Sequence, residues 1–126
     1  MKYRDYELGK WLPITWREFS DKVLQMSKSL LSVGVKVQEN IATFSQNKPE
    51  CLFVDFSAYG VRAVTIPFYA TSSGAQVVYM MNDAEIRLLF VGEQLQYDVI
   101  CEVADQCPTL EQVVIFDLLL FHPLIL

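Results

Sequence analysis

The stretch from residue 14 to residue 34 repeats apolar positions with the period of an α-helix. Thr15 and Glu18 have the spacing of a capping box, in which each side chain bonds the backbone of the other at a helix start. Gly34 offers the left-handed backbone that commonly ends a helix. The apolar positions between them are Phe19, Val23, Met26, Leu30 and Val33. The pattern predicts an amphipathic helix packed on a core.

Short apolar runs then alternate with further helical segments. Clusters of β-branched and apolar residues predict strands at 40–45, 63–66, 87–91 and 112–117. Amphipathic runs with cap residues, glycines or prolines at their ends predict helices at 47–60, 73–82 and 94–107.

Several details of these elements are also predicted. Asn47 and Glu50 have capping-box spacing, as do Ser73 and Gln76. Pro67 is expected to end its strand, because proline has no backbone N–H to donate. The side chains expected to face inward are Leu52, Phe53, Phe56, Val77, Val78, Met80 and Met81.

Alternation of strands and helices with short connections predicts an α/β fold. The expected architecture is a mainly parallel sheet with right-handed crossovers and helices on both faces. A chain of 126 residues that is 52% hydrophobic is long enough for one domain with a core, but not for two.

Charge and composition exclude some functions. The formal net charge is -5, and the absence of a Lys/Arg cluster argues against a nucleic-acid surface. No run approaches the roughly 20 apolar residues that span a bilayer, and the first residues lack the apolar core of a signal peptide. We therefore expect a cytoplasmic protein with no transmembrane segment.

The thiols and the single histidine do not indicate a catalytic or metal centre. Cys51, Cys101 and Cys107 lack the close paired spacing typical of zinc ligands, so we interpret them as structural thiols in a reducing compartment. His122 lies in an apolar tail with no sign of an anchor, and that tail would have to hold the histidine near a nucleophile. We assign no nucleophile.

The turn Thr71-Ser72-Ser73-Gly74 resembles the start of a phosphate-binding loop. Such loops need several closely spaced glycines, and here the closest two are Gly60 and Gly74. The hydroxyls of this turn remain candidates for contact with an anion. We favour a structural role for Ser73 as a helix cap, because serine is a preferred cap residue.

Two further groups of residues are weaker candidates. Asp83 and Glu85 are close in sequence, but neighbouring carboxylates at a helix-to-strand junction are usually solvated. The aromatic residues could line an apolar pocket, although their spacing favours a place in the core. They are Tyr59, Phe68, Tyr69 and Tyr79.

Three segments together resemble a known family. ITWREFSDKV, NIATFSQNKPECLFVDFSAYGVRAVTIPFYATSS and VVYMMNDAEIRLLFVGEQLQYD are similar to the amino-terminal part of AMP-forming acyl-CoA synthetases, particularly long-chain fatty acid–CoA ligases. The resemblance covers residues 11–117. It implies that residues 1–117 are a partial N-terminal, AMP-binding domain of an adenylate-forming enzyme.

The resemblance also implies an activity for the full-length family enzyme. That enzyme activates a fatty acid with ATP and Mg²⁺ as an acyl-adenylate and transfers the acyl group to CoA. The family's phosphate loop and later motifs have no counterpart here, so we assign no catalytic, cofactor-binding or metal-binding residue. We expect this chain to be inactive alone.

Residues 118–126 depart from the family pattern. Their sequence is LLLFHPLIL, an apolar run. We interpret it as a sign of truncation by a shifted reading frame or an incomplete gene. Such a tail, following a sheet edge, predicts self-association. A stand-alone α/β binding or interaction module related to the ligases remains the alternative function.

Overall fold

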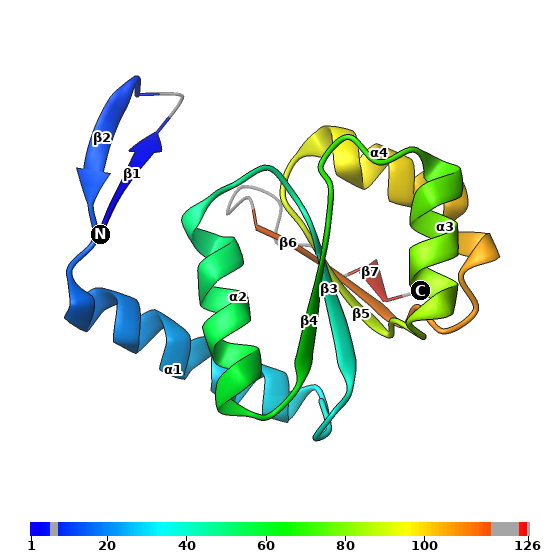
Figure 1. Cartoon of the computed structure of the whole chain (residues 1–126), viewed down its shortest axis with the longest axis horizontal. Helices are drawn as coiled ribbons and strands as arrows, with labels where there is room; N and C mark the ends of the chain where they lie inside the picture. Colours follow the sequence, from blue (N-terminus) through cyan, green and yellow to red (C-terminus); the bar gives the residue numbers. More distant parts are fainter. Residues whose placement is uncertain (6–7, 117–123, 126) are drawn as a thin grey trace.

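The centre of the molecule is a five-stranded sheet with strand order β4-β3-β5-β6-β7 (Figure 1). The computed structural model describes residues 1–5, 8–116 and 124–125. Strands β4, β3, β5 and β6 pair parallel with one another, and β7 pairs antiparallel with β6. The strands are β3 (Asn40–Phe44), β4 (Val64–Phe68), β5 (Leu88–Val91), β6 (Gln112–Ile115) and β7 (Leu124–Ile125).

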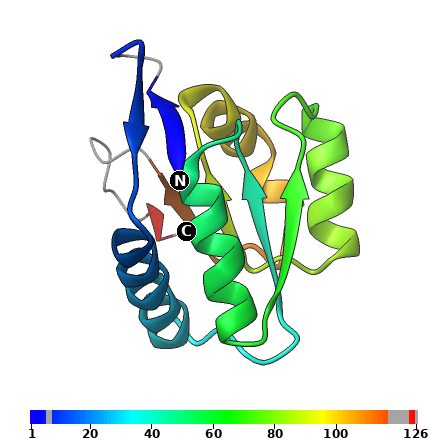
Figure 2. The ribbon, with the colours of Figure 1, turned by 60° about the vertical axis from the view of Figure 1, so that its left-hand side comes forward.

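Helices cover both faces of this sheet. Figure 2 shows α1 (Trp16–Ser32) and α2 (Pro49–Gly60) side by side on one face. The other face carries α3 (Gly74–Asp83) and α4 (Gln94–Val103), which continues into a 3₁₀ turn. The predicted α/β fold, with a mainly parallel sheet and helices on both faces, is confirmed.

Alternation of side chains along the strands divides the core in two. Ile41 of β3 packs under α1 and α2, whereas its neighbour Ala42 packs under α3 and α4. All four residues of β5 are buried, because this central strand is covered on both sides. The helix residues in these two clusters are Leu30, Val54 and Ala58 on one face and Val77, Met81, Ile100 and Val103 on the other.

The capping signals of α1 form as predicted. The Glu18 N–H donates to the Thr15 hydroxyl at 3.2 Å, and the Thr15 N–H donates to the Glu18 carboxylate at 2.8 Å. Hydrogen bonds from the backbone and side chain of Thr15 lower the pKa of Glu18. Gly34 has φ of +81°, which ends the helix in the left-handed region.

The predicted start of α2 is wrong. Its N-cap is Lys48, whose side chain makes no capping bond, and Pro49 takes the first helical position, which proline favours. Phe53 is buried as predicted, but Leu52 and Phe56 are exposed. Phe56 instead packs edge-on against Phe19 of α1, because the two helices meet along their sides.

Pro67 does not end its strand as predicted. β4 continues through it to Phe68 and is the edge strand of the sheet. The Val64 N–H donates to the carbonyl of Glu39, the residue before β3. Because the backbone polar groups of successive residues point to alternate sides of a strand, those of Thr65 and Pro67 point away from β3. A proline costs no ladder bond at such an outward position.

A hairpin at the N-terminal side was not predicted. β1 (Lys2–Asp5) and β2 (Lys10–Pro13) pair antiparallel and stand away from the sheet, joined to it through α1 (Figure 1). Mutual backbone hydrogen bonds between Met1 and Ile14 close its base. Its charged residues give no alternating apolar pattern, so the sequence carries no clear strand signal.

Within the described residues, no helix is both long enough and apolar enough to cross a membrane.

Candidate functional site

The carboxyl ends of the parallel strands form the edge of the sheet where a site is expected. The chain leaves β3 toward β4 on one side and leaves β5 toward β6 on the other. Open α/β sheets bind ligands at such a topological switch point, in the crevice beyond the carboxyl ends of the two strands. In this molecule the crevice lies between the loops that follow Phe44 and Val91.

These two loops approach each other closely. The Gly92 N–H donates to the Phe44 carbonyl at 3.0 Å, which extends the β3–β5 ladder by one bond. A Cβ on Gly92 would lie 1.8 Å from the Ser45 hydroxyl oxygen and 2.4 Å from the Ser45 Cβ. Only glycine fits there, so Gly92 brings the two loops into direct contact.

An ion pair closes the crevice. The Lys48 ammonium lies 2.9 Å from the Glu93 carboxylate and also donates to the Gly92 carbonyl at 3.1 Å. The second Glu93 oxygen accepts from the Gln46 N–H at 3.0 Å. We call Gln46, Lys48, Gly92 and Glu93 the switch-point clasp.

The clasp uses residues that begin two helices. Lys48 is the N-cap of α2 and Glu93 the N-cap of α4, and neither side chain caps its own helix. Both charges are instead directed across the crevice at each other. The Lys48 ammonium at this edge is therefore already paired with the Glu93 carboxylate of the same chain. Local sequence patterns carry no signal for this ion pair.

A thiol lies beside the clasp without being activated by it. Cys51 donates its S–H weakly to the Gln46 carbonyl at 3.6 Å. Burial raises the pKa of this thiol, and the nearby Asp55 and Glu50 carboxylates add to the effect. Cys51 therefore remains protonated at neutral pH.

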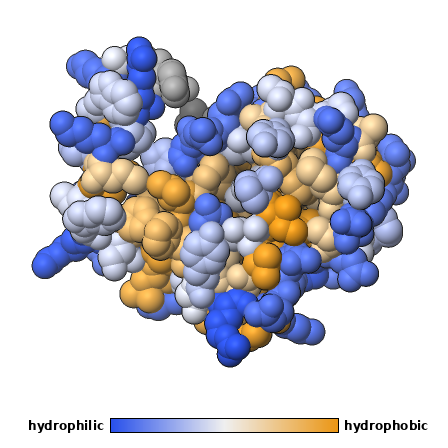
Figure 3. Space-filling model, in the orientation of Figure 1, coloured by the Kyte–Doolittle hydropathy of each residue, from blue (hydrophilic) through white to orange (hydrophobic). Residues whose placement is uncertain are grey.

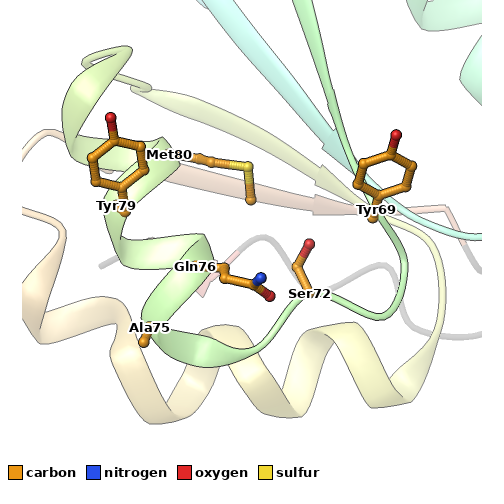
Figure 4. A pocket seen from close by; sticks show the side chains of 6 residues that line it. All are labelled: Tyr69, Ser72, Ala75, Gln76, Tyr79 and Met80. Carbon is orange, nitrogen blue, oxygen red and sulfur yellow. The ribbon is translucent and has the colours of Figure 1, made fainter.

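A pocket of about 480 Å³ opens next to the carboxyl end of β4. Figure 4 shows Tyr69 and Tyr79 on its two sides, with Met80, Gln76 and Ser72 between them. The prediction that these tyrosines belong to the core is wrong, because Tyr69 is 85% exposed and Tyr79 68% exposed. Tyr59 is likewise exposed, whereas the prediction holds for Phe68, which is buried.

The turn that leads into this pocket is shaped by two glutamines. Gln76 completes the predicted capping box, since its side-chain oxygen accepts from the Ser73 N–H at 2.8 Å and its N–H donates to the Ser73 hydroxyl. The predicted N-cap at Ser73 is confirmed. Gln96 of α4 is buried and donates to the Ala70 carbonyl at 2.8 Å. Its oxygen has no partner among the described residues.

The remaining candidates do not converge on a site. Asp83 and Glu85 are exposed, as expected for solvated carboxylates. The three cysteines are free. Across residues 1–5, 8–116 and 124–125, no group of three or more His, Cys, Asp or Glu side chains could hold a metal ion. His122 lies outside the described residues.

The opposite, amino edge of the sheet is a structural network. Arg87 pairs with Glu39 at 2.7 Å and with Glu111 at 3.1 Å, which ties together the starts of β3, β5 and β6. The hydrogen bond to Glu39 makes the largest contribution to raising the pKa of Arg87, and the hydrogen bond to Glu111 adds to it. A pocket of about 500 Å³ lies over this network, and the charges of Arg87, Glu39 and Glu111 in its wall are paired with one another.

Comparison with known proteins identifies relatives over most of the chain. A family model described as "AMP-binding enzyme" matches residues 3–123. The chain is 30% identical over 105 residues to the long-chain-fatty-acid–CoA ligase FadD15 of Mycobacterium tuberculosis, covering 83% of this chain and 18% of that protein. It is 25% identical over 112 residues to long-chain-fatty-acid–CoA ligase 6 of Homo sapiens, covering 86% and 16%.

Solved structures of ligases share the fold. The crystal structure of the anthranilate CoA ligase AuaEII with anthranoyl-AMP superposes with a TM-score of 0.79 at 20% identity, covering 85% of this chain and 20% of that one. The N-terminal domain of FACL13 from Mycobacterium tuberculosis gives a TM-score of 0.75 at 16% identity, covering 86% and 27%. The chain thus spans less than a fifth of the length of the curated relatives named above.

Proposed function

Because the chain belongs to the AMP-binding enzyme family, we propose that it supplies part of an acid–CoA ligase acting on long-chain fatty acids. The reaction converts ATP, a fatty acid and CoA into acyl-CoA, AMP and pyrophosphate, with Mg²⁺ assisting. The observation that carries the proposal is the family match over residues 3–123. The names of the relatives, most of them long-chain-fatty-acid–CoA ligases, support the substrate class.

We further propose that the chain does not form an acyl-adenylate by itself. Attack of a carboxylate on the α-phosphate of ATP needs cations that offset the growing negative charge. Lys48, the cation at the switch point, is paired with Glu93. The described residues also lack a carboxylate cluster for Mg²⁺. These residues do not fit Mg²⁺-ATP, so we derive no catalytic step from them.

The carboxyl edge is the part of the chain that we propose faces ligand in a longer protein. It carries the switch point, where open α/β sheets bind ligands. It also carries the pocket between Tyr69 and Tyr79, which combines apolar and hydroxyl groups. Such a combination suits a site that orients a mainly apolar ligand by a few polar contacts.

Exchange of pyrophosphate into ATP, driven by a fatty acid, tests the inactivity of the chain alone. FadD15 serves as the positive control and a sample without protein as the baseline. We expect the folded chain to match the baseline. Exchange above that baseline would contradict the proposed inactivity.

A chimera tests the proposed function directly. The matched 105-residue segment of FadD15 is replaced by that of this chain. We expect the chimera to retain exchange that depends on a long-chain fatty acid. A chimera that folds, as judged by circular dichroism and a cooperative melt, but shows no exchange would count against the proposal.

Two variants of the chimera test the role of the carboxyl edge. Tyr69→Ala removes one side of the pocket and should lower exchange by about tenfold through loss of ligand positioning. Tyr59→Ala is the matched control, because Tyr59 is also an exposed tyrosine but lies at the far end of α2. Equal effects of the two changes would show that the pocket has no special role.

A stand-alone binding module is the second candidate function. The exposed tyrosines at the pocket favour it, since large aromatic side chains facing solvent commonly mark a binding site. A thermal-shift screen of the chain with nucleotides, acyl chains and CoA tests it. Stoichiometric binding that Tyr69→Ala abolishes would support a module, and the absence of any shift would reject it.

We also propose a reducing, cytoplasmic location. Cys51, Cys101 and Cys107 are all free thiols, as expected where disulfides do not form. Labelling of the thiols in freshly lysed cells, before any reductant is added, would test this. Protection of two or more of the thiols from alkylation would contradict it.

A further inference from the structure

The loop that carries one wall of the tyrosine pocket lies along α4. Figure 4 shows α4, in pale yellow, beneath the loop that joins β4 to α3. At one end of the loop, the side chain of Gln96 in α4 donates to the Ala70 carbonyl at 2.8 Å. At the other end, a Cβ on Gly74 would lie 3.0 Å from the Cγ1 atom of Val103 in the same helix. Contacts with α4 therefore fix both ends of the loop.

The other hydrogen bonds of this loop are local. The Ser72 N–H donates to the Tyr69 carbonyl at 2.9 Å, and Ser73 shares its capping box with Gln76. These bonds shape the turn and the start of α3 without tying either to a distant segment. The bond from Gln96 joins residues 26 positions apart. Among the residues that the structure describes, it is the only hydrogen bond between residues 70–73 and another part of the chain.

Gln96 is a poor choice for a position that serves packing alone. Its side chain is 1% exposed, and its oxygen has no hydrogen-bond partner within the described part of the chain. A buried acceptor without a partner lost its bonds to water and gained none in return, so it lowers stability. An apolar side chain of the same length would avoid this cost. The contribution of Gln96 therefore lies in the bond that its nitrogen makes to the loop.

That bond acts directly on the pocket wall. Ala70 lies between Tyr69 and Ser72, and both of these residues line the pocket. Tyr69 is 85% exposed, so the place of its ring depends on the backbone that carries it. On the face that Figure 3 shows, the surface over α3 is largely hydrophilic, which favours a small ligand over a broad protein interface at this end of the molecule.

We propose that Gln96 is a positioning residue, which acts through the Ala70 carbonyl to hold Tyr69 and Ser72 in place for the ligand of the pocket. The inference rests on the proposed function of the carboxyl edge. No charged side chain lines the pocket, so the part of the ligand that it receives is neutral and mainly apolar. A wall that is held in place before the ligand arrives avoids the cost of ordering it during binding.

Amide hydrogen exchange of the 126-residue chain, followed by NMR, tests the positioning directly. Gln96→Met keeps the length of the side chain but cannot donate to Ala70. We expect exchange of the Ser72 N–H to become about fivefold faster, the effect of losing one ordinary hydrogen bond. The Val77 N–H, which donates to the Ser73 carbonyl in α3, should exchange as in the parent chain. Gln94→Met makes the same change at an exposed residue of α4 and should alter neither amide.

The same variants in the FadD15 chimera test the consequence for the ligand. The KM values for ATP, fatty acid and CoA are measured in turn. Gln96→Met should raise the KM of one substrate by about fivefold and leave kcat unchanged, because a displaced wall weakens binding in the ground state and the transition state alike. Gln94→Met should change none of the three. In a chimera that already carries Tyr69→Ala, Gln96→Met should have little further effect, because both residues act on the same wall.

Gln96→Glu tests whether the donor itself is what matters. A protonated carboxyl group can donate to the Ala70 carbonyl, whereas an ionised one cannot. Burial raises the pKa of a carboxyl group at this position, so the protonated form persists to a higher pH than in water. The KM of Gln96→Glu should therefore approach that of the parent chimera at low pH and rise with pH. The ratio of the Gln96→Met and parent KM values should stay constant over the same range.

Urea unfolding separates positioning from a purely structural role. We expect similar midpoints for Gln96→Met and Gln94→Met, because Ala70 is half-buried and water can reach its carbonyl in the variant. A much lower midpoint for Gln96→Met, with Ser72 exchange and all KM values unchanged, would make Gln96 a structural residue and overturn the proposal. Additive effects with Tyr69→Ala would also overturn it. An inactive parent chimera would count against the proposed function, whereas amide exchange in the 126-residue chain still decides whether Gln96 holds the loop.

Discussion

Gly92 limits the geometry of the switch point more than any other single residue discussed above. The sequence shows it only as a glycine after a strand, which is a common place for a turn. Its role comes from Ser45, a residue far away in the sequence that lies against its Cα. Lys48 and Glu93 are similar, since their pairing depends on β3 and β5 being neighbours. Local patterns do not reveal such contacts.

Gly92→Ala should destabilise the fold by about 1–3 kcal/mol, the usual cost of forcing extra atoms into a packed site. The added Cβ would meet Ser45 Oγ at 1.8 Å. Urea unfolding measures the change, and Ser45→Gly in the same chain should recover part of it. Gly60→Ala is the control, because its nearest neighbour would be Ser27 Oγ at an ordinary 3.6 Å. Equal unfolding free energies for the two alanine variants would disprove the close contact.

Elements with complete local signals were predicted correctly from the sequence. The capping boxes at Thr15 and Ser73 form, and both helices start there. The error at α2 has a physical reason, because Pro49 fits the first helical position and moves the start past Asn47. The hairpin was missed because its two short strands are stabilised by pairing with each other and carry charged residues. Its existence depends on a nonlocal contact.

The exposed tyrosines mark a limit of periodicity. Tyr79 lies on α3 at a spacing that also fits the core, but Val77 and Met81 take the buried positions. Tyr69 follows β4 and extends beyond the sheet, so no helix covers it. The candidate site was therefore only partly predictable: its turn and cap were predicted, while its pocket and clasp depend on how the strands are ordered.

The stability of the amino edge of the sheet depends on pH through Glu39, which is paired with Arg87. Burial alone would raise the pKa of Glu39, but hydrogen bonds from Arg87 and the Lys36 backbone, with the attraction of both cations, lower it below the ordinary value of 4.5. The folded state therefore holds the ionised form more strongly than the unfolded state does. The resulting stability is present above pH 4.5 and is lost as the pH falls through the lowered pKa.

Glu39→Gln removes this dependence. We expect the variant to unfold at lower urea than the parent chain at pH 7, and the difference between them to shrink as the pH is lowered below about 4.5. Glu102→Gln supplies the baseline, since Glu102 is exposed on α4 and forms no ion pair within the part of the chain that the structure describes. A difference for Glu39→Gln that stays constant between pH 7 and pH 3 would contradict the assignment.

At the scale of the whole molecule, the two edges of the sheet differ. The β4 edge points Thr65 and Pro67 outward, and the proline removes one donor that another strand would need. At the other edge, β7 pairs with the first two residues of β6, with Gln112 opposite Ile125 and Val113 opposite Leu124. Self-association through the β4 edge is therefore unfavourable, and the C-terminal segment is the source of self-association that the sequence predicts.

Residues 118–126 are the last feature with a testable consequence for the whole molecule. Seven of the nine are Leu, Ile or Phe. Each such side chain gains about 1.5–3 kcal/mol when it is fully buried, so a segment this apolar favours any arrangement that covers it. β7 provides one arrangement within the chain, and its two residues cover only half of β6. We therefore expect the segment to promote a dimer at chain concentrations on the order of tens of micromolar.

Light scattering of three forms of the chain measures this. The intact chain should be a dimer, and the chain lacking residues 118–126 should be a monomer. A third form with Leu118→Ser, Leu119→Ser and Leu120→Ser keeps the length, and should be monomeric if apolar burial drives association. A monomer in all three forms would show that the segment drives no assembly. A deletion that increases association would show instead that β7 protects the edge of β6, since removing it would uncover backbone groups that can pair with another chain.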